Sequence, residues 1–184
     1  SALGACGFFE HVGTPLVRRA DSNPTQVRLA NPLGELAAMR TSLVPGLLDA
    51  LHENARHGVD DVRIFEIGRV FARNEGSLPN ESQHLGLALM GGTPSGWNEA
   101  PREADFYDLK GVIEAIVLSL GGDPARMQLR PGVGLLDLDP LLHPGAMARI
   151  HLDGAEAAAG VIGEVHPDVR QRHDLPTRAF VAEL

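Results

Sequence analysis

The strongest hydrophobic pattern in this chain is an apolar stripe with helical spacing between residues 43 and 55. Apolar side chains three or four positions apart fall on one side of an α-helix, so the stripe predicts a helix over residues 42–57. Thr41 or Ser42 can act as the N-cap, and Pro45 is tolerated in the first turn. Gly58 suits the position that follows a helix. The stripe consists of Leu43, Leu47, Leu48, Leu51 and Ala55.

A second helix is predicted to begin after Asp105, whose carboxylate can accept hydrogen bonds from the first free backbone amides. Gly121-Gly122 ends the pattern, because glycine is favoured at the C-terminal end of a helix. The apolar positions between them again have helical spacing. They are Leu109, Val112, Ile113, Ile116, Val117 and Leu120.

The other apolar segments have the length and alternation of β-strands. Residues 62–72 carry apolar side chains on both faces, and residues 85–90 alternate leucine with small residues, so we expect these two strands to pair antiparallel. Residues 146–152 and 157–165 flank Asp153-Gly154, a strong signal for a hairpin turn. Shorter strands are expected at residues 27–30, 127–130 and 178–184, with a short helix starting at His166.

These elements predict an α+β fold, with long antiparallel strand pairs and two helices packed on one side of the sheet. The chain has 184 residues, which is enough for one hydrophobic core, so we expect a single domain over residues 1–184. No apolar run is long enough to cross a bilayer, and no secretory signal precedes the first strand. A single cysteine, Cys6, fits a reducing compartment, and we expect a cytoplasmic protein.

The charge of the chain bears on whether it binds nucleic acid. Acidic residues outnumber basic ones by 24 to 16, the net charge is −8, and Lys110 is the only lysine. The arginines are spread along the chain. A surface that binds nucleic acid extensively through its phosphates needs clustered basic residues, so the composition predicts against such a surface but leaves room for a few arginine–phosphate contacts.

Several segments, in this order, resemble one known family. The two most informative are Met39-Arg-Thr-Ser-Leu-Val-Pro-Gly-Leu-Leu48 and Ile64-Phe-Glu-Ile-Gly-Arg-Val-Phe71. The others are residues 7–10, 27–33, 105–111, 142–145 and 163–167. Together they resemble the class II synthetase-like core of phenylalanyl-tRNA synthetase beta subunits, the non-catalytic partners in that enzyme.

The resemblance implies a class II synthetase fold, a mostly antiparallel sheet with flanking helices. It also implies a role in bracing the catalytic alpha subunit within a heterotetramer that uses ATP and magnesium to attach phenylalanine to its tRNA. Magnesium-binding acids and the tRNA-anticodon module belong to other parts of such a beta subunit, so no cofactor or metal is expected in this fragment, and tRNA is expected to bind through other parts of the holoenzyme.

In the family, the helix that corresponds to residues 42–57 belongs to the subunit-interface element of class II enzymes. The resemblance therefore makes its leucines candidates for contact with the alpha subunit. The alternative is that the stripe packs only against the sheet of its own domain, which is the usual role of an amphipathic stripe. The candidate interface residues are Leu43, Leu47, Leu48 and Leu51.

Catalysis is where the chain departs from class II enzymes. These enzymes place an arginine, in a Phe-Arg-x-acid signature, beside the α-phosphate of ATP, where a fixed cation offsets the charge that develops during adenylate formation. The matching stretch here is Phe71-Ala72-Arg73-Asn74, with alanine at the arginine position and asparagine at the acid position. Arg73 is one residue away and points to the other side of a strand. The second phosphate-binding arginine would follow Phe180, and nothing up to Leu184 supplies it. We therefore expect no catalytic residues.

Three alternatives stay open at this point. A class II synthetase paralogue could bind an amino acid or adenylate in a remodelled pocket, and an interaction module could use the same fold outside translation. A metal site would require His143, Glu164 and His166 to converge, although both His-Pro pairs are better explained as junctions between strands and turns.

Overall fold

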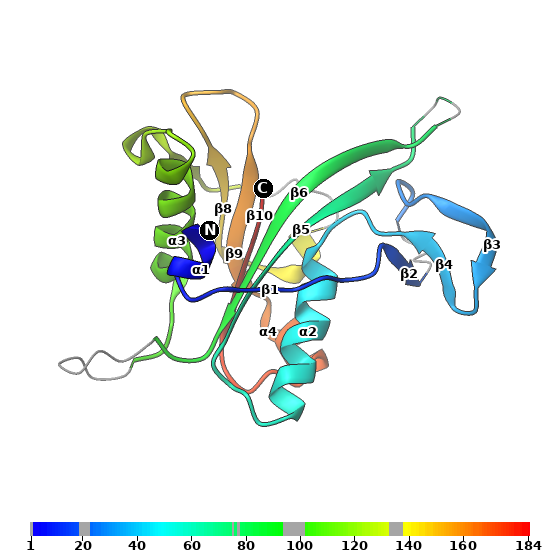
Figure 1. Ribbon diagram of the computed structural model, residues 1–184, viewed down its shortest axis with the longest axis horizontal. Coiled ribbons are helices and arrows are strands. Elements are labelled where there is room, and N and C mark those ends of the chain that lie inside the picture. The colour runs from blue at the N-terminus through cyan, green and yellow to red at the C-terminus, as the bar shows by residue number, and fades with distance from the viewer. Residues whose placement is uncertain (1, 19–22, 75, 77, 94–101, 133–137) are drawn as a thin grey trace.

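The computed structural model describes residues 2–18, 23–74, 76, 78–93, 102–132 and 138–184 (Figure 1). Its main sheet has seven strands in the order β1-β5-β6-β10-β9-β8-β7, and a smaller sheet has the order β2-β4-β3. The strands are β1 Phe9–Glu10, β2 Leu16–Arg18, β3 Arg28–Leu33, β4 Leu36–Met39, β5 Val62–Ala72, β6 Asn80–Met90, β7 Gln128–Arg130, β8 Leu142–His151, β9 Gly160–Val165 and β10 Ala179–Glu183. The helices are α1 Ala2–Ala5, α2 Val44–Arg56, α3 Phe106–Ser119 and α4 Pro167–Arg172, with short 3₁₀ turns at Pro124–Arg126 and Asp139–Leu141.

Strands β5 and β6 form the longest hairpin of the main sheet. They pair antiparallel over their full lengths, from Val62 opposite Met90 to Ala72 opposite Asn80, as the alternation of apolar residues predicted. Strand β10 lies between β6 and β9, antiparallel to both, so the last strand of the chain is central in the sheet. Only β1 pairs in parallel among the described strands, with Phe9 opposite Ile64. The mostly antiparallel sheet with flanking helices confirms the predicted α+β class.

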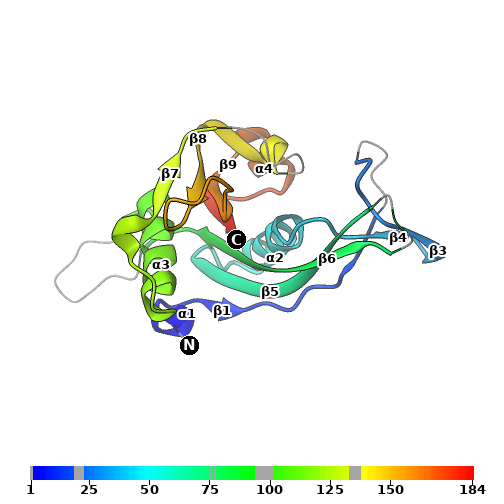
Figure 2. The same cartoon turned by 90° about the horizontal axis from the view of Figure 1, so that it is seen from above.

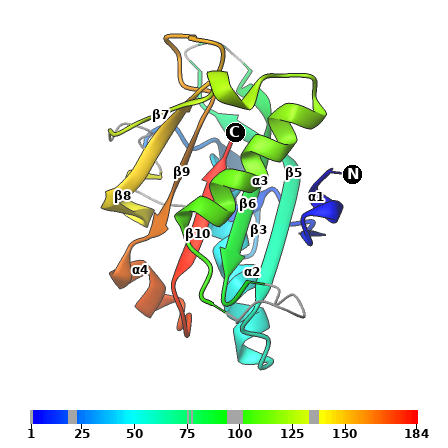
Figure 3. The same ribbon diagram turned by 90° about the vertical axis from the view of Figure 1, so that its left-hand side faces the viewer.

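Helices cover both faces of the main sheet. Helices α2 and α4 pack on one face, and α3 with α1 packs on the other (Figure 3). The prediction that two helices lie on one side is therefore wrong. The reason is visible in β6, where consecutive residues from Leu87 to Met90 are at most 1% exposed. Since successive side chains of a strand point to opposite faces, such a run is buried only when both faces are covered.

The start of α3 at Asp105 and the turn at Asp153-Gly154 form as the sequence predicted. The Asp105 carboxylate accepts hydrogen bonds from the backbone of Tyr107 (2.8 Å) and Asp108 (3.1 Å), and the Asp108 carboxylate accepts one from Asp105 N (2.7 Å), which completes a capping box. Asp153 and Gly154 have φ of 51° and 74° at the turn of the antiparallel β8–β9 pair. This turn requires positive φ at both central residues, which aspartate and glycine tolerate.

The small sheet lies beside the far end of the β5–β6 hairpin rather than on the main sheet (Figures 1 and 2). Two backbone hydrogen bonds fix this position, from Phe71 N to Arg40 O (2.9 Å) and from Arg73 N to Thr25 O (2.6 Å). None of the helices among the described residues is long and apolar enough to span a membrane.

Candidate functional site

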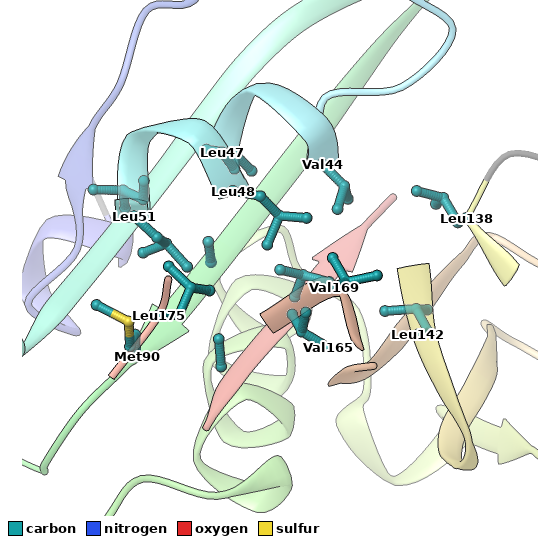
Figure 4. Close-up of a cluster of buried hydrophobic side chains, with 14 of the residues drawn as sticks. Val44, Leu47, Leu48, Leu51, Met90, Leu138, Leu142, Val165, Val169 and Leu175 are labelled. Atoms are coloured by element: carbon teal, nitrogen blue, oxygen red, sulfur yellow. The ribbon is translucent and has the colours of Figure 1, made fainter. Parts of the chain in front are cut away.

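The four leucines predicted at a subunit interface lie in the core of this chain. Leu43 is 1% exposed, and Leu47, Leu48 and Leu51 are 0% exposed. Helix α2 packs Leu47, Leu48 and Leu51 against β5, β6 and β10 (Figure 4). Leu43 directly precedes the helix as its N-cap residue. The leucine side chains come close to the backbone of β6 at Gly86, where an added Cβ would lie 2.8 Å from Leu47 Cδ1 and 2.9 Å from Leu43 Cβ.

The burial of these leucines supports the alternative that the stripe packs against its own sheet. Their side chains offer no accessible surface to a partner. A subunit contact through α2 stays a prediction, and it can involve only the outward face of the helix. That face is mostly polar, because its exposed side chains are Asp49, Glu53 and Arg56 together with Pro45.

The start of α2 is capped from a distant strand. The Glu183 carboxylate, at the end of β10, accepts hydrogen bonds from Ser42 Oγ (2.6 Å) and from Leu43 N (3.0 Å). Ser42 Oγ in turn accepts one from Val44 N (3.1 Å), while the N-cap position itself is Leu43. The prediction that Thr41 or Ser42 is the N-cap is therefore wrong in position, although Ser42 Oγ does accept from one of the first helix amides. The sequence signal also missed Glu183, which lies 141 residues away.

Glu183 also holds a short chain of polar groups on β6. Its second oxygen lies 2.6 Å from His84 Nδ1, and His84 Nε2 lies 2.9 Å from Ser82 Oγ. Glu183 is 5% exposed, whereas Ser82 lies at the surface. Each oxygen of a buried carboxylate thus has a partner, which offsets the cost of removing it from water.

Ala72, which the family resemblance sets at the position of the class II arginine, lines a cavity of about 360 Å³. Among the described residues that line this cavity there is no arginine or lysine, and the ionisable ones are His84 and Glu183. The described lining therefore offers no arginine or lysine to balance the charge of the ATP phosphates, and its carboxylate would repel them. The lining residues are Thr25, Thr41, Ser42, Ala72, His84, Leu138, Ala158, Ala159, Gly160, Val161, Glu183 and Leu184.

Arg73 faces a different space. Strand β5 ends at Ala72, and Arg73 lines a separate groove of about 780 Å³ together with Arg28. The cavity at Ala72 and the groove at Arg73 share only Thr25 among their described lining residues. The neighbouring arginine therefore does not stand in for the missing one, in agreement with the alternation of side chains along a strand.

A buried ion pair joins the two segments that carry the strongest family resemblance. Arg40 Nη1 lies 2.7 Å from Glu66 Oε1, and Arg40 Nε donates to Arg69 O (2.9 Å). Gly13 N also donates to Glu66 Oε1 (3.2 Å), and both charged side chains are less than a tenth exposed. A Cβ at Gly68 would clash with Arg40 Nη2, so a larger residue there would displace the Arg40 side chain from this pair. Sequence reasoning missed this pair because its partners are 26 residues apart.

The candidate metal ligands do not converge. The rings of His143 and His166 stack with centroids 6.1 Å apart, but Glu164 pairs with Arg178 at 2.6 Å. The Arg178 guanidinium holds the pKa of the Glu164 carboxyl below its ordinary value. His166 accepts a hydrogen bond from Asp168 N as the cap of α4. No three His, Cys, Asp or Glu side chains gather into a metal site among the residues that the structure describes.

Comparison of the sequence with known proteins identifies the family of this chain. Residues 1–184 match the family described as the phenylalanyl tRNA synthetase beta chain CLM domain. The chain belongs to this family. It is 42% identical over 167 residues to the phenylalanine–tRNA ligase beta subunit of Symbiobacterium thermophilum, covering 89% of this chain and 18% of that subunit. It is 40% identical to the beta subunit of Dechloromonas aromatica, covering 86% of this chain and 19% of that one.

Solved structures support the fold of this CLM domain. A pyrrolysyl-tRNA synthetase from Desulfitobacterium hafniense superposes with a TM-score of 0.70 at 14% identity, over 100% of this chain and 62% of that one. Such low identity establishes the class II synthetase fold alone. The chain spans about a fifth of the length of the curated beta subunits it matches.

The CLM domain exposes apolar side chains at one edge of the main sheet. Phe9 in β1 is 76% exposed, Val12 just after it is 83% exposed, and Ile67 in the adjoining strand β5 is 53% exposed. Strand β1 is an edge strand, so its outer side is open to pairing. We call Phe9, Val12 and Ile67 the β1 edge. It did not stand out in the sequence because two of its residues lie in or beside a two-residue strand with no periodicity.

Proposed function

We propose that this chain is the non-catalytic core of a phenylalanyl-tRNA synthetase beta subunit that braces the catalytic alpha subunit. The holoenzyme would attach phenylalanine to its tRNA with ATP and magnesium bound elsewhere, in the cytoplasm. The observation that carries the non-catalytic assignment is the cavity at Ala72, whose described lining holds a carboxylate and no arginine or lysine.

The charge of that cavity decides against adenylate formation. Fixed groups that stabilise developing charge usually contribute most to the acceleration of such reactions, and losing one costs about a hundredfold to a thousandfold in rate. Here Ala72 replaces such a group, while Glu183 brings in the opposite charge. The carboxylate has a structural task instead, because it caps α2 and binds Ser42 and His84.

The β1 edge is the surface best suited to the alpha subunit. Exposed apolar side chains gain free energy when a partner removes them from water, whereas the outward face of α2 is charged. An edge strand adds backbone groups that can pair with another chain. The proposal therefore moves the contact from the buried leucines of α2 to Phe9, Val12 and Ile67.

Co-expression of the full-length beta subunit with its alpha subunit tests the proposal. Light scattering on the purified complex should give the mass of an assembly for wild type and for Leu118→Asp, a control at an exposed leucine of α3. The double variant Val12→Asp/Ile67→Asp should stay folded by circular dichroism and lose the partner. Absence of a wild-type complex would refute the scaffold role. A double variant that keeps its partner would refute only the β1 edge.

A second candidate is suggested by the same cavity. Its volume of about 360 Å³ suits an amino acid, whose apolar side chain could contact Leu138 and Val161. Thermal unfolding with millimolar phenylalanine or ATP separates the two candidates. A raised Tm that is lost in Ala72→Leu would favour a ligand-binding paralogue, and an unchanged Tm favours the scaffold.

A further inference from the structure

A groove between the small sheet and the tip of the β5–β6 hairpin holds two arginines among its described lining residues, although the chain as a whole is acidic. One wall is formed by residues 24–28, which lead into β3, and the other by residues near the tip of the β5–β6 hairpin. The hydrogen bond from Arg73 N to Thr25 O (2.6 Å) joins the walls. None of the described lining residues is acidic. They are Pro24, Thr25, Gln26, Val27, Arg28, Arg73, Asn74, Gly76, Leu78 and Pro79.

The two arginines of this groove are exposed and unpaired. Among the described residues, neither the Arg28 nor the Arg73 side chain has a hydrogen bond or an ion pair. Arginines elsewhere typically lie beside a carboxylate. The pairs are Arg18–Glu35, Arg40–Glu66, Arg56–Glu53, Arg69–Glu81, Arg102–Asp108, Arg126–Asp153 and Arg178–Glu164. Two free guanidinium groups in one groove are therefore available for an external anion.

The neutral residues of the groove hold its shape. Asn74 Nδ2 donates to Asn80 Oδ1 (3.0 Å), and Thr25 Oγ1 donates to Asn23 Oδ1 (2.8 Å). Asn23 Nδ2 reaches Thr41 Oγ1 (3.3 Å), which ties this wall to the start of α2. The two arginines thus extend from walls that side-chain and backbone hydrogen bonds fix, and little ordering is needed when an anion binds.

We propose that this groove binds the phosphodiester backbone of RNA, with Arg28 and Arg73 each contacting a phosphate. The planar guanidinium fork matches two phosphate oxygens, and the open volume of about 780 Å³ admits a chain rather than one ion. Leu78, 77% exposed, and Pro79 offer apolar surface to a sugar or base. The inference rests on the proposed function, because it is the matched relatives that are named as ligases of tRNA.

The salt dependence of RNA binding tests the groove in the intact holoenzyme. Each phosphate contact contributes about −0.7 to −0.9 to the slope of log K against log salt. Arg28→Gln/Arg73→Gln should therefore reduce the slope by about 1.4 to 1.8, and each single variant by half as much. Between 50 and 200 mM KCl, the wild type would then lose about tenfold more affinity for its phenylalanine tRNA than the double variant does.

A matched control removes the same charge from paired arginines. Arg56→Gln/Arg126→Gln should keep the wild-type slope, because Glu53 and Asp153 already neutralise these side chains. A groove variant whose slope equals that of this control would overturn the inference. So would a groove variant that binds tRNA normally but has lost ATP or pyrophosphate binding, because the groove would then take free phosphates.

Light scattering on the same samples separates this inference from the proposed function. If the wild type forms no complex with the alpha subunit, the scaffold role is refuted. That result cannot be due to the groove, because the wild type keeps both of its arginines. If only the groove variant loses the alpha subunit while its RNA slope is unchanged, the groove docks an acidic protein surface and the RNA assignment is overturned. An intact complex with a reduced slope supports both.

Discussion

Removing the Glu183 carboxylate should loosen the start of α2 and separate it from β6. The carboxylate is 5% exposed and has three partners, Ser42 Oγ at 2.6 Å, Leu43 N at 3.0 Å and His84 Nδ1 at 2.6 Å. Glu183→Ala leaves all three without their acceptor. A hydrogen bond to a charged group contributes about 1.5–3 kcal/mol, and a lost helix cap costs about 1 kcal/mol.

The three contacts share one side chain, so their contributions do not simply add. We expect Glu183→Ala to lower the free energy of unfolding by about 3–5 kcal/mol, a large share of the 5–15 kcal/mol typical of a domain. Glu183→Gln should cost about 1–2 kcal/mol, because the amide oxygen can still accept from Ser42 and Leu43 while its N–H group faces His84 Nδ1, which accepts in the other tautomer.

Urea unfolding and hydrogen exchange together measure this effect in the full-length subunit. Amides at residues 43–47 should lose protection in Glu183→Ala, while those of α3 on the opposite face should change less. The double variant Glu183→Ala/Ser42→Ala should cost less than the sum of the single variants by about 1 kcal/mol, since the two groups contact each other. A Glu183→Ala subunit within about 0.5 kcal/mol of wild type would refute the reasoning, because that is the range of neutral surface changes.

The remaining predictions concern packing and pH. Gly86→Ala should destabilise the domain by about 1–3 kcal/mol, because the added Cβ meets Leu47. Gly46→Ala lies within α2 and faces open space, so it should stabilise the domain by about 0.4–1 kcal/mol. The midpoints of urea unfolding measure both changes. Leu47→Asp should unfold the domain rather than only release a partner, which circular dichroism detects, because the side chain is fully buried. Burial of its ring lowers the pKa of His173 below the unfolded value of about 6.5, so stability should fall as pH drops from 7.5 to 5.5, and His173→Gln should reduce that fall.

Periodic patterns predicted helix α2 and strand β5 closely, but they did not predict the short strands β2 and β4 of the small sheet. The strand expected at residues 62–72 is β5 with the same bounds, and the helix expected at residues 42–57 is α2, Val44–Arg56. Both depend on residues near each other in sequence, where alternation or helical spacing is a direct consequence of burial. The Asp105 cap and the Asp153-Gly154 turn were predicted for the same reason, because each needs only a few adjacent residues.

What the sequence could not predict depends on contacts between distant residues. An amphipathic stripe shows that Leu47 and Leu48 are buried, but not whether their own sheet or a partner covers them. The consecutive apolar residues of β6 indicated a strand covered on both faces, and that signal would have placed α3 opposite α2. Nothing in the sequence near Glu183 or Glu66 indicates its partner, since those partners are 141 and 26 residues away.

The two cavities at the end of β5 explain how a catalytic scaffold can lose its chemistry and keep its fold. The side chain at position 72 extends into an open cavity and not into the core, so alanine there leaves no void between packed elements. The fold is held elsewhere, by the leucines of α2, by the Arg40–Glu66 pair and by the Glu183 cap. Removing a phosphate-binding arginine therefore costs little stability, whereas each of these contacts must be kept. This separation of stability from chemistry would allow a class II domain to keep its fold without the catalytic cation and to serve in the proposed scaffold role.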